Sequence, residues 1–149
     1  MGTLTLPPAG RVYLDANAFI YSVEKIEPYT SQLYPLWVAA RAGQIQVLSS
    51  ELTLLEVMVK PYRGKDRALE GSFRDLLLGS REVALSPVDL TVLEEAARLR
   101  ALTGLKTPDA IHAATALLGG CALFVTNDAA FRRVPGLRVA VLFEIAAAP

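Results

Sequence analysis

The sequence predicts an α/β fold in which a parallel sheet is covered by helices on both faces. Short apolar segments recur along the chain and are typical of buried strands. Longer segments with apolar residues at helical spacing alternate with them, and glycines or prolines mark most boundaries. Hydrophobic residues make up 52% of the chain, which fits a sheet buried on both faces. We expect one α/β domain over residues 1–149.

Each strand is expected where a short apolar run is bounded by polar or turn-forming residues. The first strand ends directly at Asp15, and the fourth ends shortly before Asp128. The predicted strands are residues 11–14, 45–48, 82–85, 123–125 and 137–141.

The helices are predicted from apolar spacing and from start and stop signals. Ser49 or Ser50 is expected to cap the helix after the second strand, and Pro61 to end it. Residues 86–87 and 107–108 each read as a cap followed by a proline in the first turn. The first predicted helix begins near residue 17 and ends before Pro28. The other predicted helices cover residues 29–42, the serine cap (Ser49 or Ser50) to residue 60, 63–78, 88–102, 107 to about 119, and 128–133.

Composition restricts the classes of function. With 15 basic and 15 acidic residues the formal net charge is zero, so the chain is not a generally basic nucleic-acid-binding protein. Cys121 and His112 are the only cysteine and histidine, which excludes an internal disulfide and a Cys/His zinc site. Any metal must be held mainly by oxygen ligands, which suits magnesium or manganese.

Neither a membrane span nor a targeting segment is expected. No apolar run approaches the roughly 18 residues needed to cross a bilayer. The first eleven residues lack the charged start and long apolar stretch of a signal peptide. We therefore expect a cytoplasmic protein that does not associate with a membrane.

Four acidic residues stand beside apolar sequence, where a charge is costly unless it is compensated. They are Asp15, Glu56, Asp109 and Asp128. Asp15 and Asp128 follow predicted strands, whereas Asp109 and Glu56 lie near the starts of predicted helices. The carboxyl ends of parallel strands form one rim, where open α/β sheets place their sites. All four acids can therefore reach one crevice, and a divalent metal would compensate them together.

Each acid also has a structural interpretation. Asp15, Asp109 and Asp128 lie near helix starts, where an aspartate can cap the helix or complement its dipole. Glu56 is surrounded by apolar neighbours but could pair with Lys60, one helical turn later. These explanations work for the acids one at a time, and they do not explain why four acids share one rim.

Taken together, these segments resemble the PIN domain, specifically the small VapC toxin ribonucleases of VapBC toxin–antitoxin systems. Residues 14–21, with the sequence LDANAFIY, resemble the opening motif, an aspartate followed two places later by a small polar residue. The resemblance extends in order from residue 12 to residue 141. The remaining motifs correspond to residues 55–57, 109–117 and 125–128 with Phe131.

The resemblance implies a doubly wound sheet of about five parallel strands and metal-dependent endonucleolytic cleavage of RNA. Asp15, Glu56 and Asp109 are expected to bind Mg²⁺ or Mn²⁺, and Asp128 to complete the catalytic site. Asn17 and Thr126, in a second tier, would hold a carboxylate or a phosphate oxygen. The resemblance also implies a homodimer and a cognate antitoxin whose C-terminal segment lies over the acidic crevice.

Two other functions are compatible with parts of the sequence. The main alternative is a PIN-like module that binds RNA or a protein partner without cleaving it. A phosphatase with Asp15 as nucleophile is disfavoured, because Asn17 stands where such enzymes carry a second acid. A nuclease assay with and without a chelator separates cleavage from binding.

Several other residues have more than one interpretation. His112 is expected to pack or to form hydrogen bonds rather than to act as a base or a metal ligand. Trp37 is expected in the core, with an apolar groove for a partner helix as the alternative. The basic residues could contact RNA phosphates or form an ordinary solvated face. These basic residues are Lys60, Arg63, Lys65 and Arg67.

Overall fold

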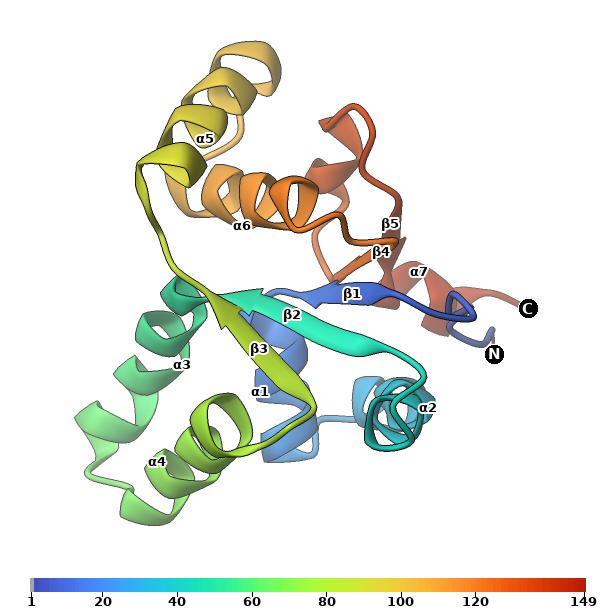
Figure 1. Ribbon diagram of the computed structural model, residues 1–149. Helices are drawn as coiled ribbons and strands as arrows, with labels where there is room; N and C mark the ends of the chain where they lie inside the picture. Colours follow the sequence, from blue (N-terminus) through green and yellow to red (C-terminus); the bar gives the residue numbers. More distant parts are fainter. Residues whose placement is uncertain (1) are drawn as a thin grey trace.

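Five parallel strands form one sheet through the centre of the protein in the computed structural model, which describes residues 2–149 (Figure 1). The strand order is β3-β2-β1-β4-β5, and every neighbouring pair is parallel. The chain moves outward from β1 to β3 and then returns to β4 on the other side of β1, so the order reverses between β1 and β4. The predicted doubly wound α/β fold is confirmed. The strands are β1 (Arg11–Leu14), β2 (Gln46–Ser50), β3 (Val83–Ser86), β4 (Leu123–Thr126) and β5 (Val139–Val141).

Helices cover both faces of this sheet. Helices α5 and α6 lie on one face, and α1 to α4 lie on the other, with α7 against α2 (Figure 1). A π-helical turn (Asp75–Gly79) follows α4, and a 3-10 helix (Ala129–Arg133) follows β4. The α-helices are α1 (Ala16–Glu24), α2 (Tyr29–Arg41), α3 (Glu51–Gly64), α4 (Arg67–Arg74), α5 (Leu90–Thr103), α6 (Thr107–Leu118) and α7 (Leu142–Ala147).

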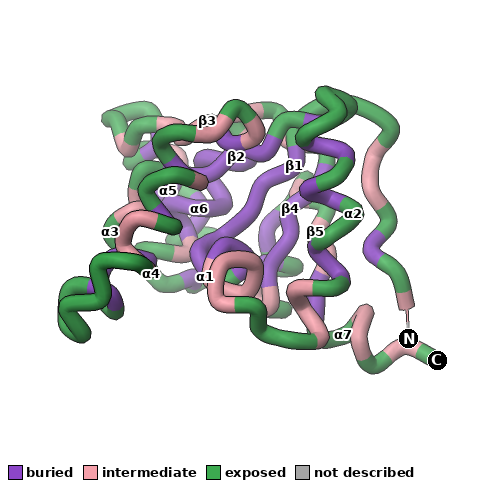
Figure 2. Tube along the Cα trace, turned by 90° about the horizontal axis from the view of Figure 1, so that it is seen from below, coloured by how far each residue is buried: buried purple, intermediate pink, exposed green. Residues whose placement is uncertain are grey.

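The two faces of the sheet have separate hydrophobic cores. Successive strand side chains point to opposite faces, so Val12 and Leu14 join the core under α1 to α4, while Tyr13 joins the core under α5 and α6. In β4, Phe124 likewise faces α5 and α6. Figure 2 shows the central strands β2, β1 and β4 largely buried, and many residues of the surrounding helices exposed. This two-sided burial accounts for the high apolar content of the sequence.

The predicted end of α3 is wrong. The helix continues through Pro61 to Gly64, and Lys65 ends it in the left-handed conformation with φ of 50°. A proline inside a helix removes one backbone hydrogen bond, but Pro61 lies in the last turn and its side chain is buried. The next helix accordingly starts late, at Arg67, with Asp66 as its cap.

Other boundaries differ from prediction for local reasons. Asp89 caps α5 through the Val92 amide, so the helix starts two residues after the predicted position. Lys106 rather than Thr107 occupies the N-cap of α6. Helix α7 was not predicted. Among residues 2–149, no helix is long and apolar enough to span a membrane.

Candidate active site

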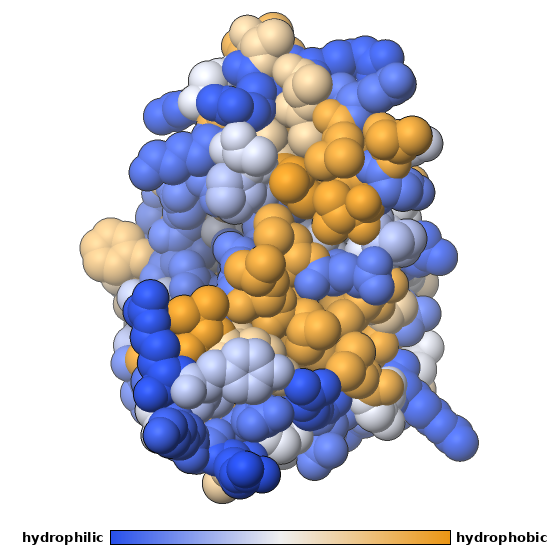
Figure 3. All heavy atoms as spheres, turned by 90° about the vertical axis from the view of Figure 1, so that its left-hand side faces the viewer, coloured by the Kyte–Doolittle hydropathy of each residue, from blue (hydrophilic) through white to orange (hydrophobic). Residues whose placement is uncertain are grey.

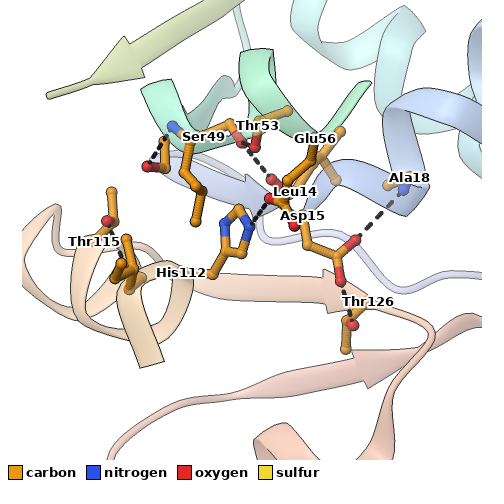
Figure 4. A network of polar contacts seen from close by, with 12 residues as sticks. Leu14, Asp15, Ala18, Ser49, Thr53, Glu56, His112, Thr115 and Thr126 are labelled. Atoms are coloured by element: carbon orange, nitrogen blue, oxygen red, sulfur yellow. Dashed lines mark hydrogen bonds and ion pairs between the residues drawn. The ribbon is translucent and has the colours of Figure 1, made fainter. Parts of the chain in front are cut away.

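Asp15 lies at the switch point of the sheet, directly after β1. One carboxylate oxygen, Oδ1, accepts a hydrogen bond from the Ala18 amide at 3.4 Å and so caps α1. The other, Oδ2, accepts from the Thr126 hydroxyl at 2.5 Å (Figure 4). Because Thr126 ends β4, the carboxylate is held between the ends of the two central strands. Asp15 is buried at 6% exposure, and Thr126 has no exposed surface.

Asp128 is connected to the same strand ends through the backbone. Its amide donates to the Thr126 hydroxyl oxygen at 3.1 Å. Its side chain is exposed and accepts from the Ala130 amide at 2.9 Å, which caps the 3-10 helix. Asn17 is exposed in the first turn of α1. The structural interpretation therefore holds for all three aspartates, because Asp15 and Asp128 cap helices with one oxygen each and Asp109 lies in the first turn of α6, where it complements the helix dipole.

Glu56 projects from α3 toward α6, where it meets His112. Its Oε1 atom lies 2.6 Å from His112 Nε2. The other ring nitrogen, Nδ1, lies 2.6 Å from the Tyr13 hydroxyl. The Glu56 side chain is partly exposed, whereas His112 and Tyr13 are buried. The alternative pairing of Glu56 with Lys60 is wrong, because Lys60 pairs with Glu24 instead.

The acids interact electrostatically across the rim. Burial raises the pKa of Asp15 from its ordinary value of 3.8 to about 6, and the Thr126 hydrogen bond opposes part of that rise. Burial also raises the pKa of Asp109, and the nearby charges of Asp128 and Glu56 raise it further. Glu56 acts on Asp15 in the same direction. Glu56 is thus coupled electrostatically to both Asp15 and Asp109, and Asp109 is coupled to Asp128 as well.

Within residues 2–149 no lysine or arginine forms an ion pair with this cluster, although the nearby charge of Lys106 lowers the pKa of Asp109. Among residues 2–149, the basic side chains that form ion pairs do so with other acids, and none pairs with Asp15, Asp109 or Asp128. Buried like charges without a cation are unfavourable. Oxygen donors of this kind are what Mg²⁺ and Mn²⁺ prefer, so the chemistry of the donor set fits a divalent ion.

The four acidic side chains do not converge on a single position. Within the described residues 2–149, no three acidic, histidine or cysteine side chains lie close enough together to hold a metal ion. The hydrogen bonds explain part of this spacing, because Thr126 and the Ala18 amide hold Asp15 while His112 holds one oxygen of Glu56. The acids line a common rim, and each is engaged by its own local partner.

Two supporting residues were not anticipated from the sequence. Ser49 was considered only as a helix cap, but Ser50 is the cap of α3. Ser49 instead donates to the Leu14 carbonyl at 2.7 Å and shares a hydrogen bond with Thr53 (Figure 4). Tyr13 was considered only as a strand residue. A tyrosine inside an apolar strand signals a buried hydroxyl that needs a partner, and that signal could have pointed to His112.

Sequence comparison now identifies the fold family. The profile of the PIN domain matches residues 12–137, which is most of the chain. The chain belongs to the PIN domain family. No curated protein matches it in sequence.

Solved structures resemble this PIN domain along nearly their whole length. VapBC2 from Rickettsia felis has a TM-score of 0.70 at 17% identity, covering 88% of this chain and 98% of that chain. A toxin–antitoxin complex from Klebsiella pneumoniae has a TM-score of 0.63 at 24% identity, covering 88% and 97%. FitAcB from Neisseria gonorrhoeae has a TM-score of 0.61 at 19% identity, covering 89% and 98%. At these identities the likeness concerns the PIN fold.

Proposed function

We propose that this PIN domain is a metal-dependent endoribonuclease and the toxin of a toxin–antitoxin pair. The observation that carries the proposal is the acidic rim at the switch point between β1 and β4, with which no lysine or arginine within residues 2–149 forms an ion pair. Open α/β sheets bind their ligands at this point. The PIN family match and structural neighbours that include toxin–antitoxin complexes support the same assignment.

In this proposal Asp15, Glu56 and Asp109 hold Mg²⁺ or Mn²⁺, and Asp128 completes the site. Thr126 orients the Asp15 carboxylate, and Asn17 is available to a phosphate oxygen. When bound, the ion would act as a Lewis acid that activates water and offsets negative charge on the scissile phosphate. Hydrolysis then requires no protein nucleophile.

RNA is the proposed substrate, and the exposed basic residues around the end of α3 and the start of α4 are suited to its backbone. Arg63, Lys65 and Arg67 are exposed, and within residues 2–149 none of them forms an ion pair. At a rise of about 1.5 Å per residue, Arg63 lies roughly 10 Å along α3 from Glu56. A bound strand could contact these cations and the acidic rim together, with a salt dependence typical of phosphate contacts.

The proposed antitoxin would cover the acidic crevice with its C-terminal segment, and a groove among α1, α2 and α4 offers it a second contact surface. The groove encloses about 600 Å³ and has an apolar floor that includes Trp37 and Leu76. Charges of both signs rim it, with Lys25 and Arg41 against Asp75 and Glu82. An amphipathic helix is the kind of segment that binds such a groove.

The proposed homodimer fits a different face, formed by α3 and α5. Apolar side chains gather there in a broad area (Figure 3). Stable homodimer interfaces are more apolar than the rest of a protein surface. The exposed apolar residues of these helices include Leu55, Val59, Tyr62, Leu90 and Leu93. Leu55→Asp should lower the dimer fraction in light scattering, whereas Phe143→Asp, on the exposed surface of α7, should not.

The function is tested by incubating the purified protein with labelled single-stranded RNA and Mg²⁺ or Mn²⁺, with and without EDTA. We expect internal cleavage that EDTA abolishes and added metal restores. RNA binding without cleavage under every metal condition would instead favour the alternative, a PIN-like binding module. Cytoplasmic location remains a prediction, which fractionation of expressing cells would test.

A further inference from the structure

A chain of two hydrogen bonds runs from the sheet core to the acidic rim. It starts at Tyr13 in β1, passes through His112 in α6 and ends at Glu56 in α3, with both bonds 2.6 Å long (Figure 4 shows the His112–Glu56 bond). Each residue comes from a different element. Two other acids of the rim lie close in sequence: Asp15 follows Tyr13 by two residues, just after β1, and Asp109 precedes His112 by three residues in α6.

The donors and acceptors of this chain have a defined direction. Burial raises the pKa of Tyr13 well above its usual value, so its hydroxyl keeps the proton. A carboxylate can only accept a hydrogen bond. In the neutral imidazole, therefore, Nδ1 accepts from Tyr13 and Nε2–H donates to Glu56. Both ring nitrogens are occupied, so His112 has no free nitrogen for a metal ion.

The first two residues of this hydrogen-bond chain, Tyr13 and His112, are tightly packed. The Tyr13 ring stacks on Phe124, with centroids 4.9 Å apart and planes 9° from parallel. His112 meets the edge of the same tyrosine at 5.8 Å and 69°. Tyr13 has no exposed surface and His112 has 2%. This packing fixes the position of Nε2–H relative to the sheet.

Glu56, at the other end of this hydrogen-bond chain, is the residue whose side chain has to be held in one orientation. The Glu56 side chain is 30% exposed on a helix surface, where a free glutamate samples several rotamers. Groups that hydrogen-bond to metal ligands orient those ligands and strengthen metal binding. We propose that Tyr13 and His112 are positioning residues that hold the Glu56 carboxylate in the orientation used to bind the divalent ion. This inference rests on the proposed metal-dependent function.

Mn²⁺ affinity of the metal-free protein, measured by calorimetry or electron paramagnetic resonance, tests the proposal. Tyr13→Phe removes one hydroxyl and keeps the stacked ring, so affinity should fall by roughly tenfold. His112→Ala should lower affinity by at least as much, and adding Tyr13→Phe to it should have no further effect. His112→Gln, whose amide can still donate to Glu56, should retain more affinity than His112→Ala.

The single histidine also provides a spectroscopic readout. In protein labelled with ¹⁵N-histidine, the two ring nitrogens should show one tautomer, with the proton on Nε2. Tyr13→Phe should relax that preference. Thr115→Val is the matched control, because it removes another buried hydroxyl of α6 that bonds only to the Ile111 carbonyl. Thermal unfolding of every variant identifies those that do not fold, and the affinity comparison then uses the others.

The outcomes distinguish failure of the proposed metal-dependent function from failure of the positioning role of Tyr13 and His112. Absence of Mn²⁺ binding by the unaltered protein would overturn the proposed function and this inference with it. Mn²⁺ binding that is equally strong in the unaltered protein, Tyr13→Phe and His112→Ala would overturn the positioning role alone. Additive losses in the double variant would contradict action of Tyr13 through His112.

Discussion

The acidic rim has two halves that are built differently. Asp15 and Asp128 come from the ends of β1 and β4, and Thr126 joins them through short hydrogen bonds. Glu56 and Asp109 come from helices, and Glu56 is held by His112 from a neighbouring helix. The strand-borne half is fixed by the sheet itself, whereas the helix-borne half depends on side-chain contacts between helices.

This difference separates the roles of the two halves. Asp15 is buried, bears a raised pKa and has no ion-pair partner within residues 2–149. Glu56 is partly exposed and has a hydrogen-bonding partner in place. We therefore expect Asp15, the buried acid of the strand-borne half, to determine whether the ion binds at all. The helix-borne half should determine how tightly and in which geometry it binds.

The largest effect is expected from Asp15→Asn, which removes the charge and keeps the side-chain shape. RNA cleavage at saturating Mn²⁺ should fall on the order of 100-fold or more, because the most buried carboxylate of the site is lost. Asp66→Asn is the control, since Asp66 also caps a helix, α4, but lies outside the rim. Cleavage by Asp15→Asn at the normal rate would remove the basis of the proposed site.

The same substitution should stabilise the metal-free protein. The folded-state pKa of Asp15 is about 6, above its ordinary value of 3.8, so the folded state binds the proton more tightly. The resulting stability is present below about pH 4 and is lost as pH rises to about 6. At pH 7, Asp15→Asn should raise the free energy of unfolding by up to about 3 kcal/mol.

Urea unfolding with EDTA across pH 4 to 8 measures this effect. Asp15→Asn should also flatten the pH dependence of stability and remove most of the stabilisation that Mn²⁺ gives the unaltered protein. A variant less stable than the unaltered protein at pH 7 would show that the Asp15 charge is compensated in some other way.

A smaller effect on cleavage is expected from Glu56→Gln. The amide oxygen still accepts from His112, so the side chain stays in place while its charge is lost. Cleavage should fall by roughly tenfold, mainly through weaker metal binding, and excess Mn²⁺ should recover part of the rate. Glu51→Gln, an exposed substitution in the first turn of the same helix, is the control. A loss equal to that of Asp15→Asn would contradict the division between the halves.

The smallest effect is expected from Asp128→Asn. Asp128 is exposed and caps a short 3-10 helix, and asparagine caps as well as aspartate. Cleavage should therefore fall only a few-fold, with no change in the thermal midpoint. A steady-state assay at several Mn²⁺ concentrations distinguishes this outcome from a complete loss, which would place Asp128 among the indispensable ligands.

Much of the fold could be predicted because its signals are local. The strand that ends at Asp15 and the helix around Asp109 follow from apolar runs and turn residues, and parallel topology then places them at one rim. The errors arose where one residue has two possible uses. Pro61 lies inside the last turn of α3, where the helix tolerates it, and Asp89 caps α5 in place of the earlier serine.

The contacts within the site could be predicted less well. The link from Thr126 to Asp15 spans 111 residues, and the link from Tyr13 to His112 spans 99. Hydrogen bonds of this kind depend on packing between elements, which the spacing of residues does not encode. His112 was expected to pack or to form hydrogen bonds, and it does so, but its partners could be identified only in three dimensions.

The central claim is that carboxylates from both halves share one divalent ion. Crystals of the protein grown with Mn²⁺ and measured for anomalous scattering test it most directly. The account predicts an anomalous peak at the rim, within roughly 2.0–2.2 Å of a carboxylate oxygen of Asp15 and bonded to Glu56 or Asp109 directly or through water. A rim that stays empty at Mn²⁺ concentrations that saturate cleavage, or a peak only elsewhere, would contradict it.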